Sequence, residues 1–139
     1  MLTRPQDWPE RLALFLREKD AQPFDWRANN CAFFACDWIA CLLGIDPAAS
    51  YRAKVDGPLS AIRAVEEAGG IESIANDACA RWEWPVQPVA LARRGDVMLY
   101  DFPTGAALGL CIGARSVFVG KEGFVFVRTM ECRTSWRVG

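Results

Sequence analysis

The chain has 139 residues, of which 52% are hydrophobic, and its formal net charge is −1. This length suits one domain with its own hydrophobic core, and we expect residues 1–139 to form a single domain. The near-neutral charge argues against nucleic acid as a main partner. The sequence contains no histidine, which excludes every histidine-based catalytic pair and every histidine-ligated metal site.

No apolar run reaches the roughly 20 residues needed to cross a bilayer, and the first residues lack the apolar region of a signal peptide. We therefore expect a soluble, intracellular protein with no membrane partner. Cysteines 31, 36 and 41 point to different sides of a helix, and no C-x-x-C pair occurs. The sequence thus predicts reduced thiols, mostly in the core, and neither a metal site nor a cofactor.

The first half of the chain is predicted to be helical. A first helix is expected at residues 8–19, and a second at residues 31–43. Asn29 or Asn30 can cap the second helix through its side-chain oxygen. This helix is apolar almost all round, with Asp37 as its one charged residue, so we expect it at the centre of the fold.

Further helical segments are predicted up to residue 80. A short helical piece is expected within residues 46–51. Pro58 then opens a helix over residues 59–68, for which we predict that Leu59, Ile62 and Val65 face inward. A last helix is expected at residues 71–80.

The second half of the chain is predicted to form a sheet. Runs rich in β-forming residues alternate with turn residues from position 96 onward, which predicts strands at 97–101, 107–112, 116–119 and 124–128 and a short one at 136–138. Helices followed by antiparallel strands define the α+β class. We expect the N-terminal helices to pack on a C-terminal antiparallel sheet.

Cys31 is the residue whose position best suits a chemical role. It is expected at the N-terminus of the apolar helix, where free backbone N–H groups and the helix dipole lower the pKa of a thiol. The alternative is a structural thiol, since free cysteine is among the most buried residue types and Cys36 and Cys41 lie in the same run.

Other polar and aromatic residues have structural explanations that we favour. We expect Asp37 to make a buried hydrogen bond to backbone or to an arginine. Asp96 is expected to begin a strand and to accept nearby N–H groups. Trp82 and Trp84 flank Glu83 and are expected to pack at the junction of helices and sheet, with an aromatic binding surface as the alternative.

Three segments carry motifs that one enzyme family shows in the same order. The aromatic-x-Trp segment Phe24-Asp25-Trp26 precedes the pair Asn30-Cys31. A Gly-Asp strand follows at residues 94–100, and then a strand rich in small residues at 107–113. This order resembles the NlpC-type cysteine peptidases, circularly permuted papain-like enzymes of bacterial cell-wall turnover and phage tails.

The resemblance implies a papain-like fold with Cys31 at the position of the nucleophile. It also implies Trp26, Asn30 and Asp96 as binding residues. The position of the general base is occupied by Ala107, and the residue that should orient the base falls near Val119 or Gly120, so both partners of the thiol are missing. We therefore predict that Cys31 titrates near the unperturbed pKa of about 8.5 or above it.

The whole chain also resembles small phage- and prophage-encoded proteins of unassigned activity, which share the final Trp-Arg-Val at residues 136–138. This resemblance implies a catalytically inactive NlpC-like domain that acts as a structural or binding protein in phage tail assembly. Its partners would be phage tail proteins or other proteins, in the cytoplasm of the bacterial host or in the virion.

Two alternatives stay open. The first is a cysteine peptidase or amidase that acts on peptidoglycan peptides through Cys31 with an unconventional base, such as an aspartate. The second is a general domain that binds peptides or small molecules and has no relation to phages.

Overall fold

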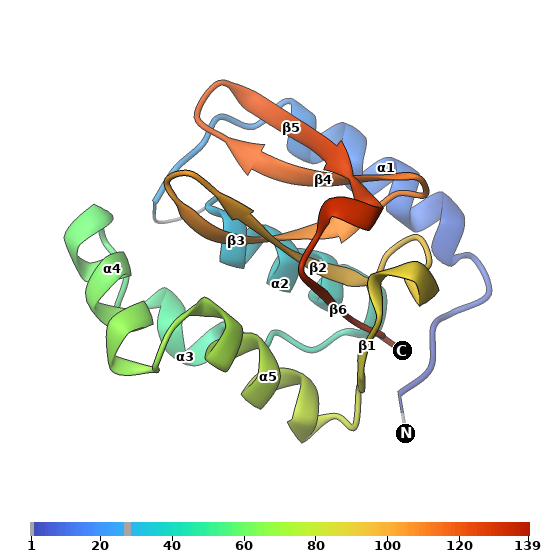
Figure 1. Cartoon of the computed structure of the whole chain (residues 1–139), viewed down its shortest axis with the longest axis horizontal. Coiled ribbons are helices and arrows are strands. Elements are labelled where there is room, and N and C mark those ends of the chain that lie inside the picture. The colour runs from blue at the N-terminus through green and yellow to red at the C-terminus, as the bar shows by residue number, and fades with distance from the viewer. Residues whose placement is uncertain (1, 27–28) are drawn as a thin grey trace.

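The computed structural model describes residues 2–26 and 29–139, and in this part of the chain helices come first and strands second (Figure 1). The helices are α1 (Trp8–Asp20), α2 (Cys31–Leu43), α3 (Ala49–Arg52), α4 (Pro58–Glu67) and α5 (Ile71–Arg81). The strands are β1 (Val86–Gln87), β2 (Val97–Phe102), β3 (Gly105–Cys111), β4 (Arg115–Gly120), β5 (Gly123–Arg128) and β6 (Thr134–Trp136). Short 3-10 helices, η1 (Val89–Leu91) and η2 (Thr129–Glu131), lie before β2 and β6. The predicted α+β class is confirmed.

The strands form one sheet in the order β1-β6-β2-β3-β4-β5, and every neighbouring pair is antiparallel. The prediction of a last strand at 136–138 was displaced by two residues, because Thr134 pairs with Leu99 and Trp136 with Val97. Strand β1 was not predicted at all. Its two residues lie between prolines and become a strand only through their pairing with β6.

Helix α2 lies against one face of the sheet and forms the centre of the core (Figure 1). Phe34 and Trp38 have no exposed surface and belong to the same buried cluster as side chains of β2, β3 and β4. Helix α1 also packs on α2, and the centroid of its Phe15 ring lies 5.5 Å from the ring centroids of both Phe34 and Trp38. The helix predicted from its apolar character to be central is therefore central.

The predicted inward face of α4 is wrong for Leu59 and Ile62, whereas Val65 is half-buried. Leu59 is 76% exposed and Ile62 is 51% exposed. Ala61 and Ala64 contact the small cluster around Phe33 instead. Small side chains let the helix approach its neighbours closely, and this leaves the larger side chains on the outer face.

Asp96 connects segments from distant parts of the chain. Its side chain is fully buried, and its Oδ1 atom accepts hydrogen bonds from Arg4 Nη2 at 2.7 Å and from the Val138 N–H at 3.1 Å. Its Oδ2 atom accepts from Gln87 Nε2 at 2.9 Å and from the Arg93 N–H at 3.0 Å. The carboxylate is therefore saturated with donors, as a buried charge requires.

Arg4 is the charged partner of Asp96. Burial lowers the pKa of Arg4 to about 10, and the attraction of Asp96 opposes this shift. The guanidinium is therefore charged at neutral pH. It also donates to the carbonyl oxygens of Val138 at 2.8 Å and Arg94 at 2.6 Å, which holds the N-terminal segment against the C-terminal one.

Replacing Asp96 by asparagine is expected to destabilise the protein by about 3 to 5 kcal/mol, because the buried guanidinium of Arg4 loses its counter-charge and the new amide turns a donor toward other donors. Urea unfolding measures this change. Asp101→Asn is the matched control, since Asp101 forms an exposed ion pair with Arg133 and should cost no more than about 1 kcal/mol. Equal losses in the two variants would contradict the role given to Asp96.

Candidate functional site

Cys31 is the first residue of α2, as predicted. The side chain of Asn30 caps the helix, because its Oδ1 atom accepts a hydrogen bond from the Phe33 N–H at 2.9 Å. Its Nδ2 atom donates to the Trp26 carbonyl at 2.9 Å. The amide of Asn30 is therefore engaged in holding the chain at the start of α2, and both of its functional groups have partners.

Trp26 lies in the segment that leads to the helix. Its ring is half-buried and stands edge-on to the Phe24 ring, with 5.0 Å between the centroids. The structure thus brings Trp26, Asn30 and Cys31 together, in agreement with their short separation in the sequence.

The thiol of Cys31 lies beside strand β3, where the backbone N–H of Leu108 is a hydrogen-bond donor to it. Leu108 lies opposite Leu99 of β2. The Leu99 carbonyl oxygen accepts a hydrogen bond from the Arg133 N–H, so the backbone groups of Leu99 point away from β3. In an antiparallel pair the N–H and C=O of one residue point to the same side, so the Leu108 N–H points away from β2. It points toward β4.

Strand β4 has separated from β3 at this point. The two strands pair at Leu110 with Val117 and at Cys111 with Ser116, but their pairing does not extend to Leu108. The separation leaves the Leu108 N–H available to the thiol of Cys31. Sequence analysis missed this contact, because the direction of a backbone N–H depends on how distant strands pair.

Burial raises the pKa of the Cys31 thiol, and hydrogen bonds from the backbone N–H groups of Leu108, Ala32 and Cys31 itself act in the opposite direction. The net direction is the one expected from the sequence. Within residues 2–26 and 29–139, no charged side chain contributes to this shift. The thiol is thus held mainly in its neutral form at neutral pH.

Ala107 occupies the strand position next to this contact. The Leu108 nitrogen is bonded to the Ala107 carbonyl carbon, so the thiol lies next to the peptide bond that joins these residues. The Ala107 methyl group is half-buried and packs against the cluster of Met98, Cys111, Phe118 and Cys132, on the face of the sheet opposite α2. It offers no group that accepts a proton.

The residues at which an orienting partner was expected are also unsuited to that role. Val119 packs against the main core, and Gly120 ends β4. Val119 has an apolar side chain and Gly120 has none, so neither residue can orient a base by hydrogen bonding through a side chain.

Asp96 does not belong to this site. The Trp38 Nε1 atom donates to the Gly95 carbonyl at 2.9 Å, which places the start of β2 beside Trp38. Trp38 is seven residues after Cys31, about 10 Å further along the helix. Asp96 therefore has the structural role that sequence analysis favoured.

Asp37 likewise has a structural role. It accepts from Lys19 Nζ at 2.5 Å and from Arg52 Nη2 at 2.6 Å. The predicted hydrogen bond to an arginine is confirmed, but Asp37 is half-buried and not buried as expected. These ion pairs connect α2 to α1 and α3.

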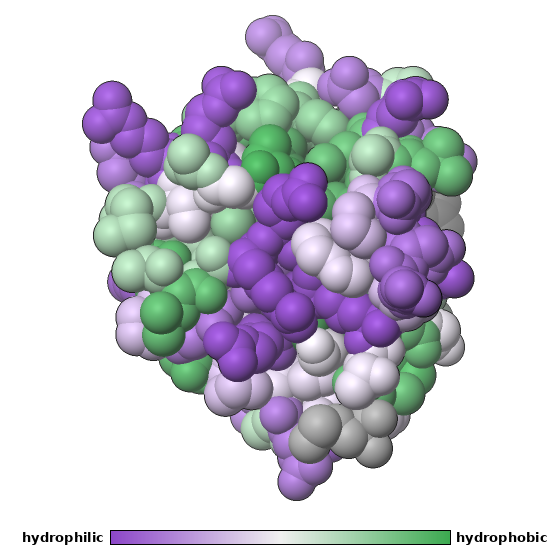
Figure 2. Space-filling view, turned by 90° about the vertical axis from the view of Figure 1, so that its right-hand side faces the viewer, coloured by the Kyte–Doolittle hydropathy of each residue, from purple (hydrophilic) through white to green (hydrophobic). Residues whose placement is uncertain are grey.

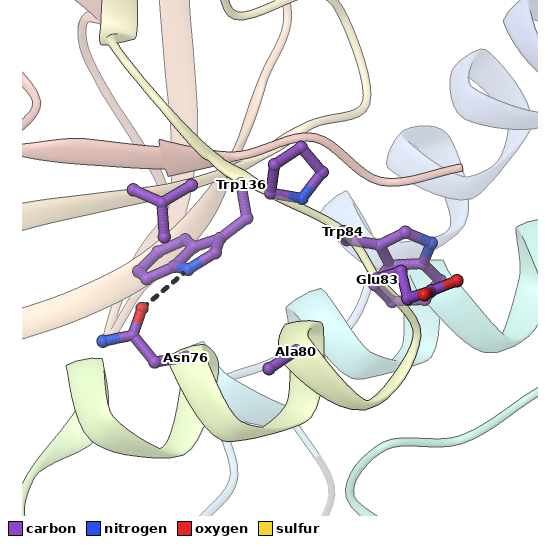
Figure 3. Close-up of a pocket in the computed structure, with 7 residues that line it drawn as sticks. Asn76, Ala80, Glu83, Trp84 and Trp136 are labelled. Atoms are coloured by element: carbon purple, nitrogen blue, oxygen red, sulfur yellow. Dashed lines mark hydrogen bonds between the residues drawn. The ribbon is translucent and has the colours of Figure 1, made fainter.

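A separate pocket of about 430 Å³ lies between α5 and the end of the sheet that contains β1 and β6 (Figure 3). The Trp136 indole N–H donates to Asn76 Oδ1 at 3.0 Å, and Trp84 lies on the opposite side of the opening beside Glu83. The other lining residues are Ala80, Pro85 and Val86. Cys31 does not line it, so the pocket and the thiol are different sites.

The tryptophans near this pocket agree with the favoured packing interpretation. Trp84 is only 5% exposed, and its ring stacks on that of Trp82 with 6.3 Å between the centroids. Sequence analysis missed the pocket because its walls include Asn76 and Trp136, which are distant in the sequence.

The fold and the site define an α+β domain with a cysteine at the N-terminus of its central helix and no histidine in the chain. The chain belongs to the DUF6950 family, because the profile of this domain of unknown function matches residues 3–138. No curated protein matches the chain.

None of the helices in the described residues is both long and apolar enough to span a bilayer. These residues also contain no cluster of three or more side chains suited to holding a metal ion.

The raised pKa of Cys31 predicts slow alkylation in acid. Iodoacetamide labelling of Cys31 should be slow at about pH 6 and should accelerate with pH up to at least about pH 9, since the thiolate is the reactive form. Peptide mass spectrometry measures the labelling rate. The variant Cys31→Ser is the control, because any labelling that it shows comes from the other five thiols. Rapid labelling at pH 6 that is absent from Cys31→Ser would mean that an unrecognised group activates the thiol.

Proposed function

We propose that this protein is a catalytically inactive, papain-like domain of the NlpC type that serves as a structural or binding protein in phage tail assembly. The observation that carries the proposal is the surroundings of Cys31. The thiol lies at a helix N-terminus, next to the Ala107–Leu108 peptide bond, and burial raises its pKa.

Three features support the papain-like part of the proposal. A cysteine begins the central helix, this helix packs on an antiparallel sheet, and the strand beside the thiol is the one in which the resemblance put the general base. The inactive part follows from chemistry. A neutral thiol is a weak nucleophile, and no imidazole is present to take its proton or to protonate a leaving amine.

The role in phage tails is drawn from the resemblance to small phage and prophage proteins, including the final Trp-Arg-Val. Trp136 and Val138 are fully buried, and the Val138 N–H donates to Asp96, so these residues have a structural reason to be present. The role in assembly therefore needs its own test.

A histidine at position 107 is expected to leave the thiol inactive. The Ala107 methyl group packs on the face of the sheet opposite α2, so the ring of Ala107→His would lie on that face, away from Cys31. The alkylation rate of Cys31 at about pH 6 should therefore be the same in Ala107→His as in Thr104→His, the matched control in the exposed turn between β2 and β3. Faster alkylation in Ala107→His alone would mean that the new ring reaches the thiol.

The assembly role is expected to appear as a stable complex. Co-expression with each tail protein encoded beside its gene, followed by size-exclusion chromatography, should yield one partner that co-elutes with this chain. The same partner should bind Cys31→Ala with unchanged affinity, since the thiol has no catalytic role in the proposal. Turnover of peptidoglycan peptides that disappears in Cys31→Ala would contradict the proposal and favour an active peptidase or amidase.

A further inference from the structure

Strand β5 forms one edge of the sheet. It has six residues and no proline, and it runs along the upper edge of the molecule in Figure 1. Two of its apolar side chains are open to solvent, Val125 at 39% exposure and Phe126 at 46%, whereas Phe124 and Val127 are half-buried. An open, apolar edge strand of this length readily pairs with another strand.

The direction of the free backbone groups follows from the pairing with β4. The Thr129 N–H donates to the Ala114 carbonyl at 2.9 Å, which continues the β4–β5 register. Since bonding directions alternate along a strand, odd-numbered residues of β5 bond to β4 and even-numbered ones point outward. Phe124, Phe126 and Arg128 therefore present their N–H and C=O groups at the free edge.

These outward groups are almost unoccupied. In the described part of the chain, their one contact beyond β4 is a weak one from Cys132 Sγ to the Arg128 carbonyl, at 3.9 Å. The opposite edge of the sheet is different, because β1 has only two residues and lies between Pro85 and Pro88. A short edge with prolines is protected from further pairing, and β5 lacks this protection.

We propose that β5 pairs antiparallel with β5 of a second copy of this chain, around a two-fold axis at Val125. The sheet would then continue from one protomer into its partner. The inference is independent of the proposed function, since it rests on the edge strand alone.

Charge selects this register. With the axis at Val125, Phe124 lies opposite Phe126 of the partner subunit, and both residues present outward backbone groups. Glu122, in the turn that leads into β5, then lies near Arg128 of the partner subunit, and the symmetry repeats this pair of opposite charges. An axis at Phe126 would place Arg128 opposite Phe124 of the partner subunit and leave Glu122 without a basic partner.

The surface near this edge suits such a contact. In Figure 2, hydrophobic side chains gather near the top of the molecule, the end at which β4 and β5 lie in Figure 1, and hydrophilic side chains project beside them. An apolar centre with charged ends is the usual composition of a protein interface.

Sedimentation velocity between about 1 and about 200 µM should show a concentration-dependent dimer. The variants Glu122→Arg and Arg128→Glu each place like charges opposite one another, and each should raise the dissociation constant by about tenfold or more. The double variant restores both ion pairs with reversed sign and should return to within about threefold of the original constant. Leu59→Arg is the control, because it places a charge on a different exposed apolar residue.

Hydrogen exchange supplies a readout that does not depend on the variants. The amides of Phe124, Phe126 and Arg128 should gain protection as concentration rises, whereas those of Val125 and Val127 are already bonded to β4. A monomer at all concentrations would overturn the proposal. A dimer that Leu59→Arg dissociates would also overturn it. So would a dimer whose dissociation constant is as high in the double variant as in the single variants.

Discussion

A buried carboxylate holds the two ends of this chain to its sheet. Asp96 has no exposed surface, and its donors come from the N-terminal segment, strand β1, the loop before β2 and the segment after β6. Removing a charge from water costs free energy unless donors replace the water, so the four segments must all be in place for the fold to be stable. The position of β6, and of the Trp136 side chain that it carries into the core, depends on this arrangement.

The same constraint determines what surrounds Cys31. Helix α2 is fixed by the core at Trp38 and by the bond from Trp38 to the Gly95 carbonyl, next to Asp96. Its N-terminus then meets β3 where β4 has moved away. Gly109 is required nearby, since a Cβ atom there would lie 2.3 Å from the Val117 carbonyl oxygen. The backbone thus supplies donors to a thiol that no acidic or basic side chain of the described residues activates.

Two exposed apolar surfaces of the described residues differ in physical character. The outer face of α4 exposes apolar side chains, but it has no unpaired backbone groups that would specify how another molecule binds. The free edge of β5 combines apolar side chains with a regular series of outward N–H and C=O groups, and therefore specifies both the direction and the register of a partner strand.

The sequence by itself determined the features that depend on neighbouring residues. The apolar run from Cys31 to Leu43 defined the central helix, Asn29 and Asn30 limited its cap to two residues of which the structure uses Asn30, and the absence of histidine excluded histidine-based catalysis. The tertiary structure decided what depends on distant residues. Pairing with β6 made β1 a strand, close packing through Ala61 and Ala64 turned Leu59 outward, and the separation of β4 from β3 left the Leu108 N–H to Cys31. Periodicity and capping act within a few residues, whereas strand pairing joins parts of the chain whose separation leaves no local signal.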